Sequence, residues 1–217
     1  MDILTALKER KSARAYLDKP VSRRDIEEIL AAAALAPSAI NLQPWEFVVT
    51  YGEEKERLVR RLLKARSERV VACGPGTDKP LPALISRRAT EALAVMEPHI
   101  AAPGLSFNEF IEAGSCAFYG APVAIIVAID KLFPVLRYLD VGLAVSQLLL
   151  AAQAKGLATC PIGLILAYQG DIAQALNIPE QKEILLGIAL GYADESAPVN
   201  SFRTNRANQA EIVTWYE

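Results

Sequence analysis

Apolar residues near the start of the chain recur at helical spacing. Ile26, Ile29 and Ala33 fall on one face of an amphipathic helix. Ser22 precedes this run as a helix cap, and Pro37 ends it because proline disfavours helical backbone at the preceding residue. The pattern therefore predicts a helix between these two residues.

The remaining periodicity predicts four strands and further helices. The predicted strands cover residues 46–50, 123–129, 157–165 and 184–192. One predicted helix is capped by Asp2, has Ile3, Ala6 and Leu7 on one face, and runs into a cluster of cations. The other predicted helices cover residues 53–70, 84–97, 107–118, 140–155 and 171–176. Residues 73–82 and 101–106 are broken by glycine and proline and are expected to be loops. We expect one α+β domain over residues 1–217, with a lid-like excursion at about 73–118.

Two segments near the end of this pattern point to a second subunit. The helix at 140–155 is apolar almost all round, so we expect it to be buried on every side, in part by a partner. Its most apolar part, residues 141–154, is too short for a membrane span and contains polar residues. The strand-like tail at 211–216, EIVTWY, needs the edge of a sheet, in its own chain or in a partner.

Composition narrows the classes of function. The 217 residues have a formal net charge of −2 and are 52% hydrophobic, so the chain is globular, and neither nucleic acid nor a membrane is the expected partner. Cys73, Cys116 and Cys160 form no CxxC pair, and buried apolar positions in a reducing cytoplasm are the simplest interpretation. His99 is the only histidine, so a histidine-rich metal site is excluded and no metal is expected.

Cations gather around one hydroxyl group at the end of the first helix. Arg10, Lys11 and Arg14 flank Ser12 in the stretch ERKSARAY. Guanidinium and ammonium groups beside a hydroxyl suit a phosphomonoester, which needs several donors. Taken alone, such a cluster is also typical of an ordinary solvated surface.

A second polar stretch lies where a helix turns into a strand. It reads APSAINLQPWEFVV, and Pro37, Ser38, Ala39 and Asn41 lie in its turn. Turns of this kind often position ligand-binding groups. An ordinary loop anchored by the large Trp45 side chain is the simpler alternative.

Together the two stretches resemble the FMN-dependent nitroreductase family, and the resemblance covers nearly the whole chain. The matching segments are RKSAR at 10–14, PSAINLQPWEF at 37–47, GAPVAIIV at 120–127, DVGLAVSQLLLAAQAKGLATCPIG at 140–163 and ALGYADESAPVNSFRTNRANQAEIVTWYE at 189–217. The resemblance implies a three-layer α/β/α sandwich around a mostly antiparallel sheet. It also implies an intertwined homodimer with FMN at the subunit interface.

The resemblance further implies roles for individual residues. Arg10, Lys11, Ser12 and Arg14 would hold the phosphate, ribityl and pyrimidine side of FMN, and Arg206 would return to the phosphate. The residues expected to reach the flavin from the other subunit are Pro37, Ser38, Ala39 and Asn41. The residues expected along the flavin ring, with backbone N–H groups toward N5 and O4, are Pro161, Ile162 and Gly163.

This chain departs from the family pattern at two of these positions. Thr204 stands where many members have lysine, and Arg203 is the candidate to replace that charge. Ile162 stands where many members have glutamate, which leaves a backbone contact possible but removes a side-chain role.

The expected chemistry is a ping-pong cycle. NAD(P)H would give a hydride to flavin N5 and leave, and a small planar acceptor such as a nitroaromatic or a quinone would then be reduced in its place. The candidates for the acceptor pocket are Phe107, Phe110 and Phe118, although core packing explains these aromatics equally well. The alternatives are another reductive chemistry of the family, such as enone reduction or dehalogenation, a flavin carrier or redox sensor without turnover, and a dimeric domain without a cofactor.

Overall fold

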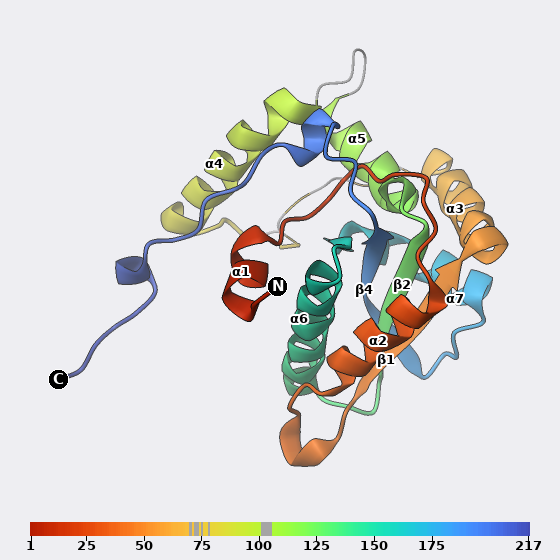
Figure 1. Cartoon of the computed structure of the whole chain (residues 1–217), viewed down its shortest axis with the longest axis horizontal. Helices are drawn as coiled ribbons and strands as arrows, with labels where there is room; N and C mark the ends of the chain where they lie inside the picture. Colours follow the sequence, from red (N-terminus) through yellow and green to blue (C-terminus); the bar gives the residue numbers. More distant parts are fainter. Residues whose placement is uncertain (70, 72–73, 75, 78, 101–105) are drawn as a thin grey trace.

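A computed structural model describes residues 1–69, 71, 74, 76–77, 79–100 and 106–217 (Figure 1). The expectations for Cys73, for the helix end at residue 70 and for the loop at 101–105 lie outside these described residues.

Four strands form one antiparallel sheet at the centre of the molecule. They are β1 (Trp45–Tyr51), β2 (Val123–Asp130), β3 (Ala158–Ile162) and β4 (Lys182–Gly191), in the order β1-β2-β4-β3. Each neighbouring pair is antiparallel, which confirms the predicted sheet. The third strand is shorter than predicted, because residues after Ile162 turn into a 3-10 helix over Leu164–Tyr168.

Helices cover both faces of this sheet and produce the three-layer sandwich (Figure 1). The helices are α1 (Ile3–Glu9), α2 (Arg23–Ala34), α3 (Gly52–Ser67), α4 (Ala83–Ile100), α5 (Phe107–Cys116), α6 (Tyr138–Ala154) and α7 (Gln169–Leu176). Along β2, Ile125 packs toward α2 and α6, whereas the next residue, Ile126, packs toward α3 and α7. This alternation explains why β2 reads as one continuous apolar run, since both of its faces are buried.

Local capping explains where the first two helices begin. Asp2 Oδ1 accepts hydrogen bonds from the backbone N–H groups of Leu4 (3.0 Å) and Thr5 (3.1 Å). Ser22 Oγ accepts a hydrogen bond from the backbone N–H of Asp25 at 3.1 Å, as the sequence predicts. Both helices therefore begin as predicted, because their first N–H groups find partners within three residues.

Helix α6 differs from its prediction, because only one side of it is buried in the chain. It packs against α1, α2, β1 and β3, but the Leu139 side chain is 65% exposed. By length and composition alone the stretch Val135–Ala154, with a mean hydropathy of 1.5, would suffice to cross a membrane. The expectation that no run is long enough for this was therefore wrong. Only 28% of that stretch is buried, so α6 presents an open apolar face.

The tail and the excursion complete the fold. Residues 212–217 form no strand, so this chain's own sheet does not supply the edge that the tail needs.

Helices α4 and α5 form the excursion, and α4 lies outside the sandwich beside the segment that leads to the C-terminus (Figure 1). That the excursion acts as a lid stays a prediction.

Candidate functional site

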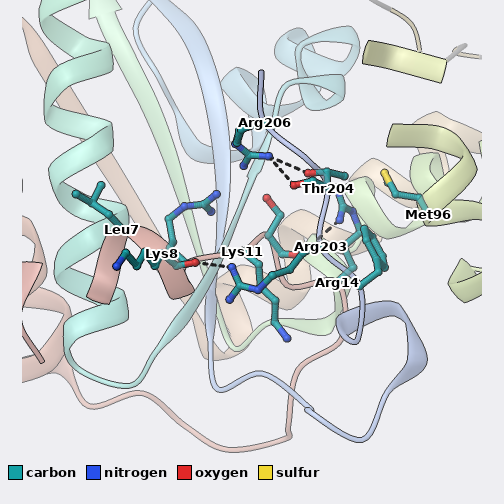
Figure 2. A pocket seen from close by; sticks show the side chains of 11 residues that line it. Leu7, Lys8, Lys11, Arg14, Met96, Arg203, Thr204 and Arg206 are labelled. Carbon is teal, nitrogen blue, oxygen red and sulfur yellow. Dashed lines mark hydrogen bonds between the residues drawn. The ribbon is translucent and has the colours of Figure 1, made fainter. Parts of the chain in front are cut away.

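Two distant parts of the chain face each other across a cavity of about 320 Å³ (Figure 2). One part is the end of α1 with the residues after it, and the other is the segment at 202–206. The lining of the cavity includes Ser12, Met96 of α4 and six cationic side chains, which are Lys8, Arg10, Lys11, Arg14, Arg203 and Arg206. The cation cluster predicted from the sequence is therefore a cavity wall, and a second cationic segment enlarges it.

Strand β3 holds the cation cluster in place on one side. The backbone N–H of Ala13 donates to the carbonyl of Thr159 at 3.0 Å, and Ser12 forms a parallel bridge with the same residue. Residues 10–14 therefore run beside the start of β3. Because the backbone is fixed by the sheet, the flanking side chains point into the cavity from a rigid base.

Asn200 holds the cation cluster in place on the other side. Its side chain is 1% exposed, and its Oδ1 accepts a hydrogen bond from the backbone N–H of Arg14 at 2.8 Å. Its Nδ2 donates to the carbonyls of Ala15 (2.8 Å) and Asp194 (2.9 Å). Sequence reasoning missed this residue, because an asparagine in a loop resembles any turn residue and only its burial reveals the role.

Electrostatic repulsion is built into the cavity. Burial lowers the pKa of Arg10, and the positive charges of Arg206 and Arg203 lower it further. Arg10 Nη1 and Arg14 Nε are both buried and have no hydrogen-bond partner within the part of the chain that the structure describes. Unpaired buried donors among like charges favour an anionic ligand with several acceptor oxygens.

Two of the other cations have partners within the chain. Arg203 donates from Nη1 to the carbonyl of Lys8 at 2.6 Å and from Nη2 to that of Glu9, so it caps the last turn of α1. Lys11 Nζ donates to the backbone carbonyl of Asn200 and forms an ion pair with Glu195 at 3.0 Å.

Thr204 supports the neighbouring arginine. Arg206 Nη1 donates to the Thr204 hydroxyl at 3.0 Å, and the guanidinium lies at the cavity rim (Figure 2). Thr204 adds no charge of its own, whereas Arg203 brings a charge to the same wall. That Arg203 replaces the missing lysine stays a prediction.

The residues predicted along the flavin ring lie farther along β3 and just beyond its end. Ile162 is 3% exposed, and its side chain packs in the core, so that side chain cannot take the role of the glutamate that many members have. Cys160 lies between this strand end and the cations, and burial raises the pKa of its thiol. Pro161 and Gly163 are at least partly accessible. Pro161, Ile162 and Gly163 do not line the cavity itself.

The second polar stretch lies far from the cavity in the same chain. Figure 1 places the loop between α2 and β1 at the bottom of the view, well below α1. Ser38 Oγ accepts a hydrogen bond from the Gln43 backbone N–H at 2.9 Å, and the backbone N–H of Ala39 donates to Asp140 at 3.4 Å. Pro37 and Asn41 belong to the same loop, so none of these four residues joins the cations within one chain.

Backbone strain marks this loop. Ile40 has a φ of 43° and is 91% exposed, although a β-branched residue is disfavoured in the left-handed region. Asn41 and Gln43 also have positive φ. Strain on an exposed, apolar loop tip is typical of functional segments.

The whole chain matches known proteins. Residues 7–192 match the sequence profile described as the Nitroreductase family. The chain belongs to the nitroreductase family. A 4-nitrobenzoate reductase of Pseudomonas putida is 34% identical, over 94% of this chain and 91% of its own length. A 4-nitrobenzoate reductase of Nocardioides sp. strain LMS-CY is 31% identical, over 95% of this chain and 86% of its own length.

A solved nitroreductase has the same fold. The crystal structure of the FMN-dependent nitroreductase NfnB from Mycobacterium smegmatis, in complex with NADPH, is 27% identical and covers 100% of both chains with a TM-score of 0.88. The nitroreductase fold predicted for this chain is therefore confirmed.

Of the three aromatic residues predicted for the acceptor pocket, Phe118 lies elsewhere. Phe118 is 0% exposed and packs in the core below Gly187, so it lines no pocket and the prediction was wrong for it. The competing interpretation, core packing, is the correct one. Phe107 lines an apolar cavity of about 620 Å³ between α4 and α5, and the ring centroid of Phe110 lies 6.1 Å from that of Tyr119.

Proposed function

We propose that this nitroreductase is an enzyme that binds FMN and transfers electrons from NAD(P)H to a small planar acceptor. Bound FMN supplies the redox chemistry, since it accepts a hydride from NAD(P)H and passes electrons on to the acceptor. The relatives named above reduce 4-nitrobenzoate according to their names, so we propose a nitroaromatic acceptor here, with quinones as a second class.

The observation that supports FMN most directly is the unpaired donor pair in the cavity. Arg10 Nη1 and Arg14 Nε are buried within a wall of six cations, although the whole chain has a net charge of −2. The FMN phosphate, with close to two negative charges, would satisfy the Arg10 donor and relieve the repulsion around it, and an acceptor oxygen on the pyrimidine side of the flavin would satisfy the Arg14 donor.

The protein's own residues would position the cofactor and offset its charge. Arg10, Arg206 and the Ser12 hydroxyl would hold the phosphate. Arg14, fixed by its backbone bond to Asn200, would lie beside the pyrimidine side and offset the negative charge gained there on reduction. The backbone N–H groups of Ile162 and Gly163 would contact the flavin ring, which would lie along residues 161–163.

A homodimer would complete the site. Exposed apolar side chains cover α1, where Ile3 is 67% and Leu4 is 63% exposed, and they continue on α6, where Leu139 is 65% exposed. In the tail, Trp215 is 74% exposed. Contiguous apolar surface of this kind marks an interface. A partner seated there would bury α6 and bring its loop at 37–41, which lies apart from the cations in one chain, to the cofactor.

The cysteines support the proposed compartment. Cys116 and Cys160 are both free and buried. Free thiols without a disulfide suit a reducing cytoplasm, which we propose as the location.

Reconstitution and turnover test the proposed function. Protein loaded with FMN is titrated anaerobically with NADPH and NADH while flavin absorbance is followed, and 4-nitrobenzoate or a quinone is then added. We expect bleaching by a nicotinamide and recovery by the acceptor, with parallel lines in double-reciprocal plots. A flavin carrier would bind FMN without this turnover, and protein that stays colourless with FMN would overturn the proposal.

Arg14→Ala tests the binding site itself. We expect FMN affinity to fall about ten- to a hundredfold, which corresponds to the 1.5–3 kcal/mol of a charge-assisted hydrogen bond. Arg60→Ala is the matched control, because Arg60 is exposed on α3. Unchanged affinity in Arg14→Ala would exclude that role.

A further inference from the structure

A second cationic cavity adjoins the first. It has a volume of about 340 Å³ and lies between α4 and the segment that leads to the tail. Arg87 and Arg88 of α4 line it, and Arg206 lines both cavities. The second cavity therefore lies beside the proposed site of the FMN phosphate, next to any dinucleotide that would stack on the flavin and extend past that phosphate.

Carboxylates form ion pairs with the arginines of this second cavity. Arg88 Nη2 pairs with Glu211 Oε2 at 2.9 Å, and Arg87 pairs with the same oxygen at 3.6 Å. Arg87 Nε also lies 3.6 Å from Glu91. Arg88 Nε is buried and has no hydrogen-bond partner among the described residues, so the Glu211 carboxylate leaves one donor unused.

The carboxylate that pairs with these arginines is held weakly. Glu211 belongs to a single 3-10 turn, Gln209–Glu211, with irregular chain on either side. Its ion pairs are partly exposed, and such pairs stabilise a protein only slightly. A stronger anion can therefore displace this carboxylate at little cost.

We propose that Arg87 and Arg88 bind the 2′-phosphate of NADPH and give the enzyme a preference for NADPH over NADH. The inference rests on the proposed function, in which a nicotinamide dinucleotide reduces the flavin. The two dinucleotides differ only in this phosphate, which carries close to two negative charges at neutral pH. Two arginine forks and the free Arg88 Nε match its oxygens better than they match one carboxylate. NADH has no such group, so Glu211 stays in place when NADH binds.

Binding of nucleotide fragments tests the inference without turnover. Adenosine 2′,5′-bisphosphate and 5′-AMP are titrated into the FMN-loaded protein by calorimetry. We expect the bisphosphate to bind about tenfold tighter, and Arg87→Ala/Arg88→Ala to erase the difference. Arg88→Lys, which keeps the charge but loses the fork, is expected to retain part of it. Glu211→Gln is expected to tighten bisphosphate binding, and Arg60→Ala is the control that leaves it unchanged.

Steady-state kinetics give a second readout. In the double variant the ratio of kcat/KM for NADPH to that for NADH is expected to fall about tenfold, with unchanged FMN content. Equal binding of the two fragments by the wild-type protein would overturn the inference while leaving the proposed function intact. Absence of turnover with either dinucleotide would overturn the proposed function, and the fragment titration would still decide whether the arginines recognise the phosphate.

Discussion

Asn200 Oδ1 accepts a hydrogen bond from the backbone N–H of Arg14 at 2.8 Å and joins two segments that are 186 residues apart in the chain. The same side chain donates to the carbonyls of Ala15 and Asp194. Three bonds from one buried amide hold the cation cluster against the segment that leads to Arg203 and Arg206. The shape of the cavity therefore depends on a residue that does not line it.

Replacing Asn200 should therefore loosen the cavity. We expect Asn200→Ala to lower the free energy of unfolding by about 1–3 kcal/mol, because it leaves the buried Arg14 N–H without a partner. The carbonyls of Ala15 and Asp194 lose one bond each but still accept from the backbone N–H groups of Asp194 and Ala197. FMN affinity should fall with the stability. Urea denaturation and a flavin-fluorescence titration measure the two effects. Asn108→Ala, at an exposed position on α5, is the control, and equal stability of the two variants would contradict the role.

Anions that bind beside Arg10 should stabilise the flavin-free protein. Its pKa is lowered by burial and by Arg206 and Arg203, so an anion removes a repulsion that the empty cavity retains. We expect inorganic phosphate and FMN to raise the melting temperature. Arg10→Ala should abolish most of this rise while changing the melting temperature of the flavin-free protein little. A phosphate response in that variant equal to the wild type would count against the cavity as the anion site.

A buried carboxylate joins the excursion to the sandwich. Glu112 on α5 is 8% exposed and accepts a hydrogen bond from the Tyr168 hydroxyl at 2.6 Å. Nε of Arg66, on α3, lies 3.4 Å from Glu112 Oε2. We expect Tyr168→Phe to destabilise the fold by about 1–3 kcal/mol, because the carboxylate loses a donor in a dry site. Tyr216→Phe, at a residue that is 95% exposed, should have no effect in the same denaturation assay.

The Cys116 thiol should make the protein sensitive to alkali. Burial raises its pKa from 9.0 to about 11. Between these two pH values the unfolded chain loses the thiol proton while the folded chain keeps it, so stability falls as pH rises. Below pH 9 the thiol is protonated in both states and contributes nothing to the pH dependence.

Cys116→Ser removes this titration and keeps the size of the side chain. Its unfolding free energy, measured in urea at pH 8, 9.5 and 10.5, should fall less steeply than that of the wild type. Identical slopes would show that the thiol does not titrate in this window. Tyr168 neighbours this thiol and burial raises the pKa of its hydroxyl as well, so the comparison is made in a Tyr168→Phe background.

Trp215 should report on the dimer. It is 74% exposed in the single chain, whereas Trp45, the only other tryptophan, is 9% exposed. In a Trp45→Phe background, docking of the tail on a partner should shift Trp215 emission to shorter wavelength and protect it from iodide. Emission typical of a fully hydrated indole in a protein that sediments as a dimer would show that the tail is not docked.

Local features of the sequence were the reliable guides to the fold. Ser22 and Asp25 interact within three residues, and the odd and even residues of β2 reach opposite faces by backbone geometry alone. The cation cluster was found for the same reason, because Arg10 and Arg14 are neighbours in the sequence.

Features that depend on more than one element were harder to predict. Composition did not distinguish Phe118, which is core, from Phe107, which lines a cavity, because both are aromatic residues of one excursion. The all-round apolar character of α6 predicted complete burial, yet a single chain has too few elements to cover its outer side.

The sequence by itself determined the helices, the strands and the placement of cations after α1, because capping, side-chain period and charge are properties of neighbouring residues. Only the tertiary structure decided that residues 202–206 face residues 7–14 and that Arg206 borders two cavities. The physical reason is distance along the chain. The antiparallel course of β4 beside β3 returns the C-terminal segment to α1, and Asn200 then fixes the two segments together.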